Sequence, residues 1–392
     1  MNATRKNLSG FIIAACSLAF AACNQPANTT STTATMTDST TQGTLPPKEG
    51  FEKTIDGKQA HLYILKNKNG VQAAITNYGG RLISLMVPDK AGKMTDVVVG
   101  FDAIDGYKKS LMAFYGATIG RYGNRIAKGS FKLEGKQYTL FINNKPNTLH
   151  GGKKGFDDVV WDVEKTDEHA ISLTYLSKDR EEGYPGNLKC KVTYELTDDN
   201  AVKISYEATT DKTTVVNLTN HAYYNLNGIG SGTILDHVVE FKAANYTPVD
   251  SNLIPTGKIT PVAGTPFDFT KPAAIGSRIN VNDEQLKNGK GYDHNFVLDK
   301  HDINTAIATV TGDKSGIIMQ IFTDEPGLQF YSGNFMKGAN TMLGGKKDDY
   351  RSAFAMETQH YPDSPNQPQF PTTTLKPGEV YKTVTIYKFS VK

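Results

Sequence analysis

Short runs in which apolar and polar residues alternate make up most of the chain from Phe51 onward. Two such runs, 189–196 and 202–208, flank the polar turn 197–200. Side chains of a strand point alternately to opposite faces, so a period of two on both sides of a short turn predicts an antiparallel hairpin.

The same pattern recurs toward the C-terminus. Residues 307–310 and 316–322 predict a second hairpin, and residues 380–389 predict a final alternating strand. The segment 95–99 is continuously apolar after Asp96, which predicts a buried strand. Helical spacing is confined to short stretches such as 283–288. Strands that follow strands through short turns predict an all-β fold, a large mostly antiparallel sandwich or barrel, in one domain that spans residues 48–392.

Composition supports this fold class. The 392 residues are 38% hydrophobic and 21% charged, and include 36 Gly, 19 Tyr and 18 Phe, so aromatic and turn-forming residues favour β-structure. The net charge of +3 is too small to create the basic field that holds nucleic acid. We therefore expect no nucleic-acid partner, and nothing in the sequence implies a protein partner.

The N-terminus has the order of a bacterial lipoprotein signal. Arg5 and Lys6 precede an uncharged, mostly apolar run over 11–22, and Cys23 follows two alanines. We expect residues 1–22 to be a signal peptide and Cys23 to carry the lipid. Cys16 is a competing lipidation site, and a plain secretory signal cut near Ala22 is the other alternative.

Residues 23–47 are rich in Thr, Ser, Ala, Asn and Gln, and cannot bury enough apolar surface to order themselves. They are predicted to be a flexible tether behind the lipid. We expect an exported protein whose only membrane contact is this anchor, on the periplasmic or cell-surface face. Cys190 is the remaining thiol after Cys16 and Cys23, so no disulfide framework is predicted.

Several catalytic motifs are missing from the sequence. It has no Walker loop, no His-Glu-x-x-His, no Cys-x-x-Cys and no Gly-x-Ser-x-Gly, and the glycines at 228–232 lack the spacing of a dinucleotide fingerprint. These absences weigh against phosphoryl transfer, zinc or serine hydrolysis and nicotinamide chemistry. We expect no cofactor and no metal.

Two polar segments carry the candidate chemistry. His221 lies in 217–226 among amides, hydroxyls and phenols, and Glu357 lies in similar surroundings in 356–363. Neutral polar groups and aromatic faces match the hydroxyls and the C–H face of a sugar. A histidine and a carboxylate placed there indicate acid–base chemistry on a carbohydrate, although either segment alone also fits a structural turn.

Other polar segments lie between the predicted strands. They hold Asn124 and Arg125 in 119–126, His150 on a predicted exposed turn before two glycines, Asp293 beside His294, and Gln329 between apolar neighbours. In an extended segment Asp293 and His294 point to opposite faces, so only one of them can enter a given site.

Taken in order, these segments resemble the aldose 1-epimerases, the galactose mutarotases. The resemblance covers residues 50–392 and rests on eight motifs, at 120–127, 147–152, 217–226, 249–257, 291–296, 326–331, 357–359 and 366–371. It implies the large antiparallel β-sandwich of that family, the supersandwich, and a free aldose such as galactose or glucose as substrate.

The resemblance also implies residue roles. Glu357 matches the catalytic base and His221 the catalytic acid. Six residues match those that hold the sugar hydroxyls, and His150 among them is sometimes given an assisting catalytic role: Asn124, Arg125, His150, Tyr223, Asp293 and Gln329. The implied reaction removes the proton from the anomeric hydroxyl while protonating the ring oxygen, and the open aldehyde rotates and closes on its other face.

Three alternatives remain open from the residues. A glycoside hydrolase could use Asp293 and Glu357 as its two acids. A non-catalytic sugar-binding lipoprotein would need the sugar contacts but neither Glu357 nor His221. A sugar-phosphate mutarotase would need more clustered cations than Arg125 alone supplies.

Overall fold

The computed structural model describes residues 44–110 and 114–392, so the predicted signal peptide, the predicted lipidation site Cys23 and most of the predicted tether lie outside the described residues. The described residues form one compact unit, and the fold below is that of this unit. Its first regular element is the 3₁₀ turn Lys48–Phe51. Within the part of the chain that the structure describes, no helix has both the length and the apolar character needed to cross a membrane.

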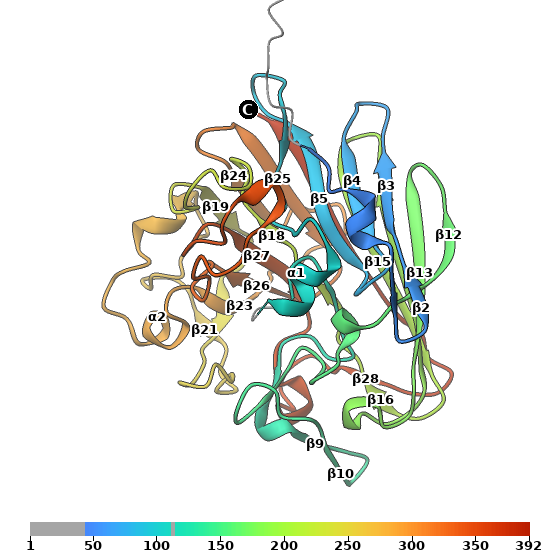
Figure 1. Cartoon of the computed structure of the whole chain (residues 1–392). Coiled ribbons are helices and arrows are strands. Elements are labelled where there is room, and N and C mark those ends of the chain that lie inside the picture. The colour runs from blue at the N-terminus through green and yellow to red at the C-terminus, as the bar shows by residue number, and fades with distance from the viewer. Residues whose placement is uncertain (1–43, 111–113) are drawn as a thin grey trace, which may run out of the picture. The chain divides into compact units, whose positions relative to one another are not determined.

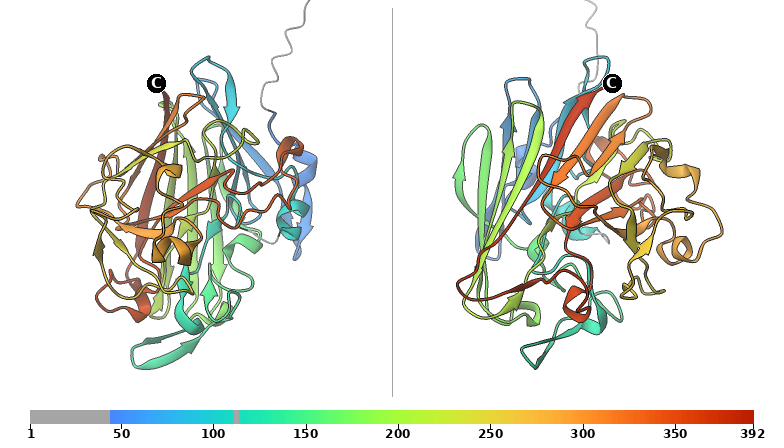
Figure 2. Two further views of the ribbon diagram at one scale, coloured as in Figure 1. Left: turned by 90° about the vertical axis from the view of Figure 1, so that its left-hand side faces the viewer. Right: turned by 180° about the vertical axis from the view of Figure 1, so that it is seen from behind.

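A nine-stranded antiparallel sheet forms one layer of the fold (Figures 1 and 2). In Figure 2 the long, dark red β29 runs beside the orange β25. The strand order is β12 (Asp162–Thr166), β13 (Ala170–Ser177), β14 (Leu188–Leu196), β15 (Ala201–Thr210), β29 (Tyr381–Val391), β25 (Ile317–Thr323), β24 (Ala308–Thr311), β19 (Val238–Phe241) and β22 (Ala273–Ala274).

Two further antiparallel sheets face this layer. The six-stranded sheet has the order β18 (Tyr223–Tyr224), β27 (Phe354–Gln359), β26 (Gly327–Tyr331), β23 (Asp293–Val297), β20 (Asn245–Thr247) and β21 (Thr260–Pro261). The four-stranded sheet has the order β3 (Leu62–Lys66), β4 (Gln72–Thr76), β5 (Arg81–Pro88) and β6 (Met94–Asp96).

The remaining elements are short. Five two-stranded pairs are β1 (Lys53–Ile55) with β2 (Lys58–Ala60), β7 (Thr118–Ile119) with β17 (Thr219–Asn220), β8 (Arg125–Ile126) with β11 (Thr148–Leu149), β9 (Ser130–Leu133) with β10 (Lys136–Thr139), and β16 (Thr214–Val215) with β28 (Thr374–Leu375). The helices among the described residues are α1 (Ile104–Lys109), α2 (Glu284–Gly289) and the 3₁₀ turns Lys48–Phe51, Ala127–Gly129, Phe156–Asp158, Glu181–Gly183, Ile275–Ser277, Leu343–Gly345 and Ser364–Asn366.

The largest hydrophobic core lies between the nine-stranded sheet and the other two sheets. Phe241 of β19 packs against Phe296 of β23 and Phe330 of β26, with ring centroids 4.9 and 5.4 Å apart. The phenol of Tyr387 in β29 donates to the carbonyl of Met356 in β27 at 2.9 Å. These contacts confirm the predicted antiparallel β-sandwich.

The local predictions hold with one correction. The hairpin of β14 and β15, that of β24 and β25, and the short helix α2 all form, and Asp283 caps α2 by accepting from the backbone N–H of Gln285 and Leu286. The predicted strand at 95–99 is wrong in extent, because β6 ends at Asp96. The Asp96 carboxylate accepts from the N–H groups of Leu85 and Val98. Beyond Val97 the backbone turns to β18, where the N–H of Asn225 donates to the carbonyl of Val97 and that of Val99 to the carbonyl of Tyr223.

Strand alternation decides which residues face away from the core. Met356 and Thr358 of β27 point toward the nine-stranded sheet, so Glu357 between them faces the opposite side. In β23, His294 packs on Phe267 with centroids 4.6 Å apart, and Asp293 faces the opposite side of the sheet. That outer face of the six-stranded sheet carries the site.

Candidate active site

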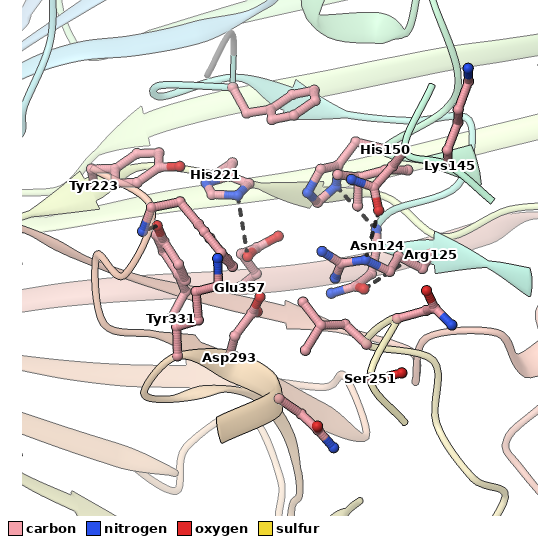
Figure 3. A pocket seen from close by; sticks show the side chains of 18 residues that line it. Asn124, Arg125, Lys145, His150, His221, Tyr223, Ser251, Asp293, Tyr331 and Glu357 are labelled. Carbon is pink, nitrogen blue, oxygen red and sulfur yellow. Dashed lines mark hydrogen bonds and ion pairs between the residues drawn. The ribbon is translucent and has the colours of Figure 1, made fainter. Parts of the chain in front are cut away.

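A cavity of about 410 Å³ opens over this face of the six-stranded sheet (Figure 3). Strands β18, β23, β26 and β27 supply its floor, and loops around β8, β11 and α2 supply its walls. It is lined by Phe114, Asn124, Arg125, Asn144, Lys145, Leu149, His150, His221, Tyr223, Ser251, Asn252, Leu253, Asn288, Lys290, Asp293, Tyr331, Phe335 and Glu357. Seven of the eight residues predicted to act on the sugar lie in this lining, and Gln329 does not.

Glu357 and His221 meet at the bottom of the cavity. Oε1 of Glu357 lies 3.5 Å from Nε2 of His221, and both side chains are buried. Burial raises the pKa of the Glu357 carboxyl well above its ordinary value; the charge of Asp293 adds to this effect and that of Arg125 opposes it. Burial also lowers the pKa of His221 to about 4. Each group is therefore biased toward its neutral form.

Backbone and ring contacts hold His221 in place. Its N–H donates to Ala117 and its carbonyl accepts from Gly116, which ties the segment between β17 and β18 to the loop before β7. The imidazole stacks on Tyr223 with ring centroids 4.9 Å apart. Phe114 lies near its ring with a centroid distance of 6.0 Å. These rings fix the direction of Nε2 toward Glu357.

His150 is buried rather than exposed, which corrects the predicted exposed turn. Its backbone N–H donates to the carbonyl of Asn124, and Phe114 packs on its ring with centroids 4.6 Å apart. The backbone N–H of Asn124 donates to Nδ1 of His150 at 3.1 Å. Burial first, and then the charges of His221 and Arg125, lower the His150 pKa well below its usual range. A neutral ring whose Nδ1 accepts must carry its proton on Nε2.

Asn124 and Arg125 form the wall beside His150. Asn124 adopts a left-handed backbone with φ of 64°, a conformation that asparagine tolerates better than most residues, and its Oδ1 accepts from the N–H of Arg125. The guanidinium Nε of Arg125 donates to Oδ1 of Asn144 at 3.2 Å. Arg125 is only 8% exposed, so a largely buried charged donor group lines the cavity.

Gln329 lies behind Asp293 and outside the lining. Its Nε2 donates to Oδ1 of Asp293 at 2.7 Å, and its side chain is buried. Burial raises the pKa of Asp293, against the opposing effects of Arg125 and Gln329. The structure thus gives Gln329 a bond that orients a carboxylate of the cavity.

Comparison with known proteins identifies the family. A sequence profile described as aldose 1-epimerase matches residues 61–388. The chain is 45% identical over 317 residues to the galactose mutarotase of Rattus norvegicus, covering 81% of this chain and 90% of that protein. It is 38% identical over 337 residues to the aldose 1-epimerase of Escherichia coli strain K12, covering 85% and 96%. The chain belongs to the aldose 1-epimerase family.

Solved structures agree with this assignment. The aldose epimerase homologue from C. elegans matches with a TM-score of 0.79 and 33% identity over 85% of this chain and 99% of that one. The galactose 1-epimerase from Lactobacillus acidophilus NCFM matches with a TM-score of 0.76 and 30% identity over 86% and 97%. Among the alternatives left open by the sequence, membership of the aldose 1-epimerase family favours anomer interconversion over glycoside hydrolysis or sugar binding alone.

Three side chains of this aldose 1-epimerase site could in principle bind a metal ion. Among the described residues, His150, His221 and Glu357 each offer one potential ligand atom, and these atoms lie within 4.8 Å of one another. A ligating nitrogen must present a lone pair. Because Nδ1 of His150 accepts from Asn124 and its Nε2 carries the proton, this ring presents a donor instead. The tautomer therefore suits a sugar hydroxyl better than a cation.

Several lining residues were not singled out from the sequence. Tyr331 lies in the motif that contains Gln329, and Ser251, Asn252 and Leu253 lie in the motif at 249–257, so the resemblance pointed to their segments. Phe114, Lys145 and Lys290 had no such signal, because aromatic and lysine residues are common in loops and only the folded chain brings them to one cavity.

Proposed function

We propose that this aldose 1-epimerase interconverts the α- and β-anomers of free hexoses such as galactose and glucose, with Glu357 and His221 as its acid–base pair. The observation that carries the proposal is the 3.5 Å separation of Glu357 Oε1 and His221 Nε2 at the buried end of the cavity. A sugar whose anomeric carbon lies there meets both groups at once.

The reaction needs one base and one acid. Glu357 removes the proton from the anomeric hydroxyl while His221 donates a proton to the ring oxygen, and the bond between C1 and the ring oxygen breaks. The aldehyde then rotates about C1–C2. On closure the two groups exchange roles. His221 takes back the proton from the former ring oxygen, Glu357 gives its proton to the oxygen on C1, and both side chains return to their starting protonation.

The two pKa shifts favour this direction of proton transfer. Burial makes the carboxylate of Glu357 a stronger base and the imidazolium of His221 a stronger acid than either group in water. The pKa of His221, about 4, lies below the near-neutral value of an unperturbed histidine. The active form of the pair holds one proton in total, shared between the two side chains.

The other predicted residues position the sugar. Arg125 and the Nε2–H of His150 donate to hydroxyls, and Asp293 accepts from them with its carboxylate oriented by Gln329. Asn124 shapes this wall through its backbone N–H to His150. Tyr223 supplies the aromatic face next to His221.

Polarimetry tests the proposed function. Fresh α-galactose and α-glucose should reach their equilibrium rotation faster with the protein than without it, and nitrophenyl glycosides should release no nitrophenol. Release of nitrophenol without faster mutarotation would replace the proposal with a glycoside hydrolase that uses Asp293 and Glu357.

We also propose that Cys23 anchors the protein to a bacterial membrane from the exported side. Support comes from the charged, apolar, small-residue and cysteine order of residues 1–23 and from the polar segment behind it. Cys23→Ser should move the protein from the detergent phase to the aqueous phase, whereas the control Cys16→Ser should leave it in the detergent phase. The reverse result would assign the lipid to Cys16, and no change in either variant would rule out a lipidated cysteine.

A further inference from the structure

Asn217 carries hydrogen bonds that join three segments of the active site. The residue is fully buried and lies outside the cavity lining. Its Nδ2 donates to the carbonyl of Gly123 at 3.2 Å and to that of His360 at 3.1 Å, and its Oδ1 accepts from the backbone N–H of His360 at 3.0 Å. An asparagine side chain has two N–H donors, so both donors and the acceptor oxygen of this amide are engaged with segments remote in the sequence.

The two bonds to His360 hold the end of β27. His360 directly follows Gln359, the last residue of this strand, and the strand carries Glu357. The His360 side chain pairs with Glu325, its Nδ1 lying 2.6 Å from the carboxylate, so only the backbone of His360 takes part in the contact with Asn217. Because Asn217 begins the segment that contains His221, its amide ties the strand of the base to the segment of the acid.

The bond to Gly123 orients a peptide unit that also contacts His150. The carbonyl of Gly123 and the backbone N–H of Asn124 belong to one planar unit and point in opposite directions. Asn217 holds the carbonyl, and Nδ1 of His150 accepts from the N–H at 3.1 Å (Figure 3). The N–H of Gly123 also donates to the carbonyl of Asn217 at 2.7 Å. A rotation of this peptide unit would remove the donor that keeps the proton of His150 on Nε2.

We propose that Asn217 is a positioning residue of the reaction, which keeps His150 in the tautomer with its proton on Nε2 and holds the strand of Glu357 beside His221. The inference rests on the proposed function, in which Glu357 and His221 open the ring and the Nε2–H of His150 donates to a sugar hydroxyl. Asn217 acts through the backbone of Gly123 and His360 and has no place in the lining itself.

The test variant is Asn217→Asp, which removes both donors and keeps an acceptor oxygen. Asn77→Asp is the matched control, because Asn77 is also buried outside the cavity lining. Its Nδ2 donates to the carbonyls of Gln59 and Trp161, both at 3.1 Å, and its Oδ1 accepts from the N–H of His61 at 2.7 Å. Each change removes the same kinds of hydrogen bond from a buried amide, so both variants should lose Tm to a similar extent.

Two measurements separate a positioning role from a structural one, each made well below the Tm of the variant. Polarimetry should give a kcat/KM for galactose about ten- to a hundredfold lower in Asn217→Asp, since displacements of about 1 Å cost rates of that order. Histidine-selective nitrogen NMR of the full chain, with His150 identified by the signals that His150→Gln lacks, should show its proton on Nε2 in the wild type. In Asn217→Asp both ring nitrogens should share the proton. Asn77→Asp should keep the wild-type kcat/KM and the wild-type His150 signals.

An unchanged kcat/KM in folded Asn217→Asp overturns the inference, and so do unchanged His150 signals or an equal loss of kcat/KM in Asn77→Asp. If Asn217→Asp does not fold, Asn217→Ala takes its place with Asn77→Ala as control, because alanine brings no acidic group next to the carbonyls. Loss of the fold in both Asn217 variants but not in the controls assigns the residue to stability alone and overturns the inference. A wild type that does not speed mutarotation refutes the proposed function, and the His150 signals then still test whether Asn217 sets the tautomer.

Discussion

Replacing Glu357 by glutamine isolates the proton transfer from the packing around it. Glutamine keeps the volume and the position on β27 between β18 and β26, but it cannot accept the anomeric proton. General acid–base catalysis by one positioned group contributes roughly 10²–10⁴ in rate, which corresponds to about 3–5 kcal/mol of transition-state stabilisation. We expect kcat for galactose to fall by that factor in Glu357→Gln, with a smaller change in KM.

Although Glu357→Gln should lower kcat, it should not lower the stability of the fold. Burial raises the pKa of the Glu357 carboxyl in the folded protein above its value in the unfolded chain. At any pH above the unfolded pKa, the unfolded chain therefore loses this proton more readily than the folded protein does. The carboxyl then lowers the free energy of unfolding. Glutamine has no charge to bury. Thermal denaturation at neutral pH should therefore give an unchanged or higher Tm for Glu357→Gln.

Glu325→Gln is the matched control. Glu325 is buried like Glu357 but lies outside the cavity, and its carboxylate pairs with His360 at 2.6 Å and accepts from Tyr381. Weakening this buried, charge-assisted contact costs about 1–3 kcal/mol, so the variant should lose stability and keep its kcat. A Glu357→Gln enzyme that folds and retains kcat within about tenfold of the wild type would contradict the proposed acid–base pair.

Four further outcomes follow from the structure. The acid limb of kcat/KM should fall near pH 4, because below the pKa of His221 the pair holds two protons; a limb near pH 6.5 would refute this. Glycine tolerates the φ of 64° at position 124, so Asn124→Gly should raise KM more than it lowers kcat. An effect on kcat alone would exclude a positioning role for Asn124. Asp283→Ala should lower the free energy of unfolding by about 0.5–2 kcal/mol in denaturant titration through loss of the α2 cap. A chelator should leave mutarotation unchanged, and restoration of a lost activity by a divalent metal would contradict the cofactor-free reaction.

The sequence predicted the fold class and singled out Glu357 and His221, which the structure brings to 3.5 Å from one another. A period of two around short turns fixes strand faces, because consecutive side chains must point in opposite directions. That rule placed Asp293 and His294 on opposite faces, as the structure confirms for Asp293 in the cavity and His294 against Phe267. The motif around Glu357 and the motif around His221 pointed to one carbohydrate site.

Only the tertiary structure decided the environment of each group. Burial depends on which loops cover a strand face, so neither the depressed pKa of His221 nor the burial of His150 could be predicted from neighbouring residues. Gln329 was predicted to hold the sugar, and only the pairing of β23 with β26 shows that its Nε2 donates to Asp293. Lys145 and Lys290 are far apart in sequence, and their common cavity arises from packing between distant loops. Local patterns set the direction of a side chain, whereas its partners, exposure and proton affinity depend on contacts between segments remote in the chain.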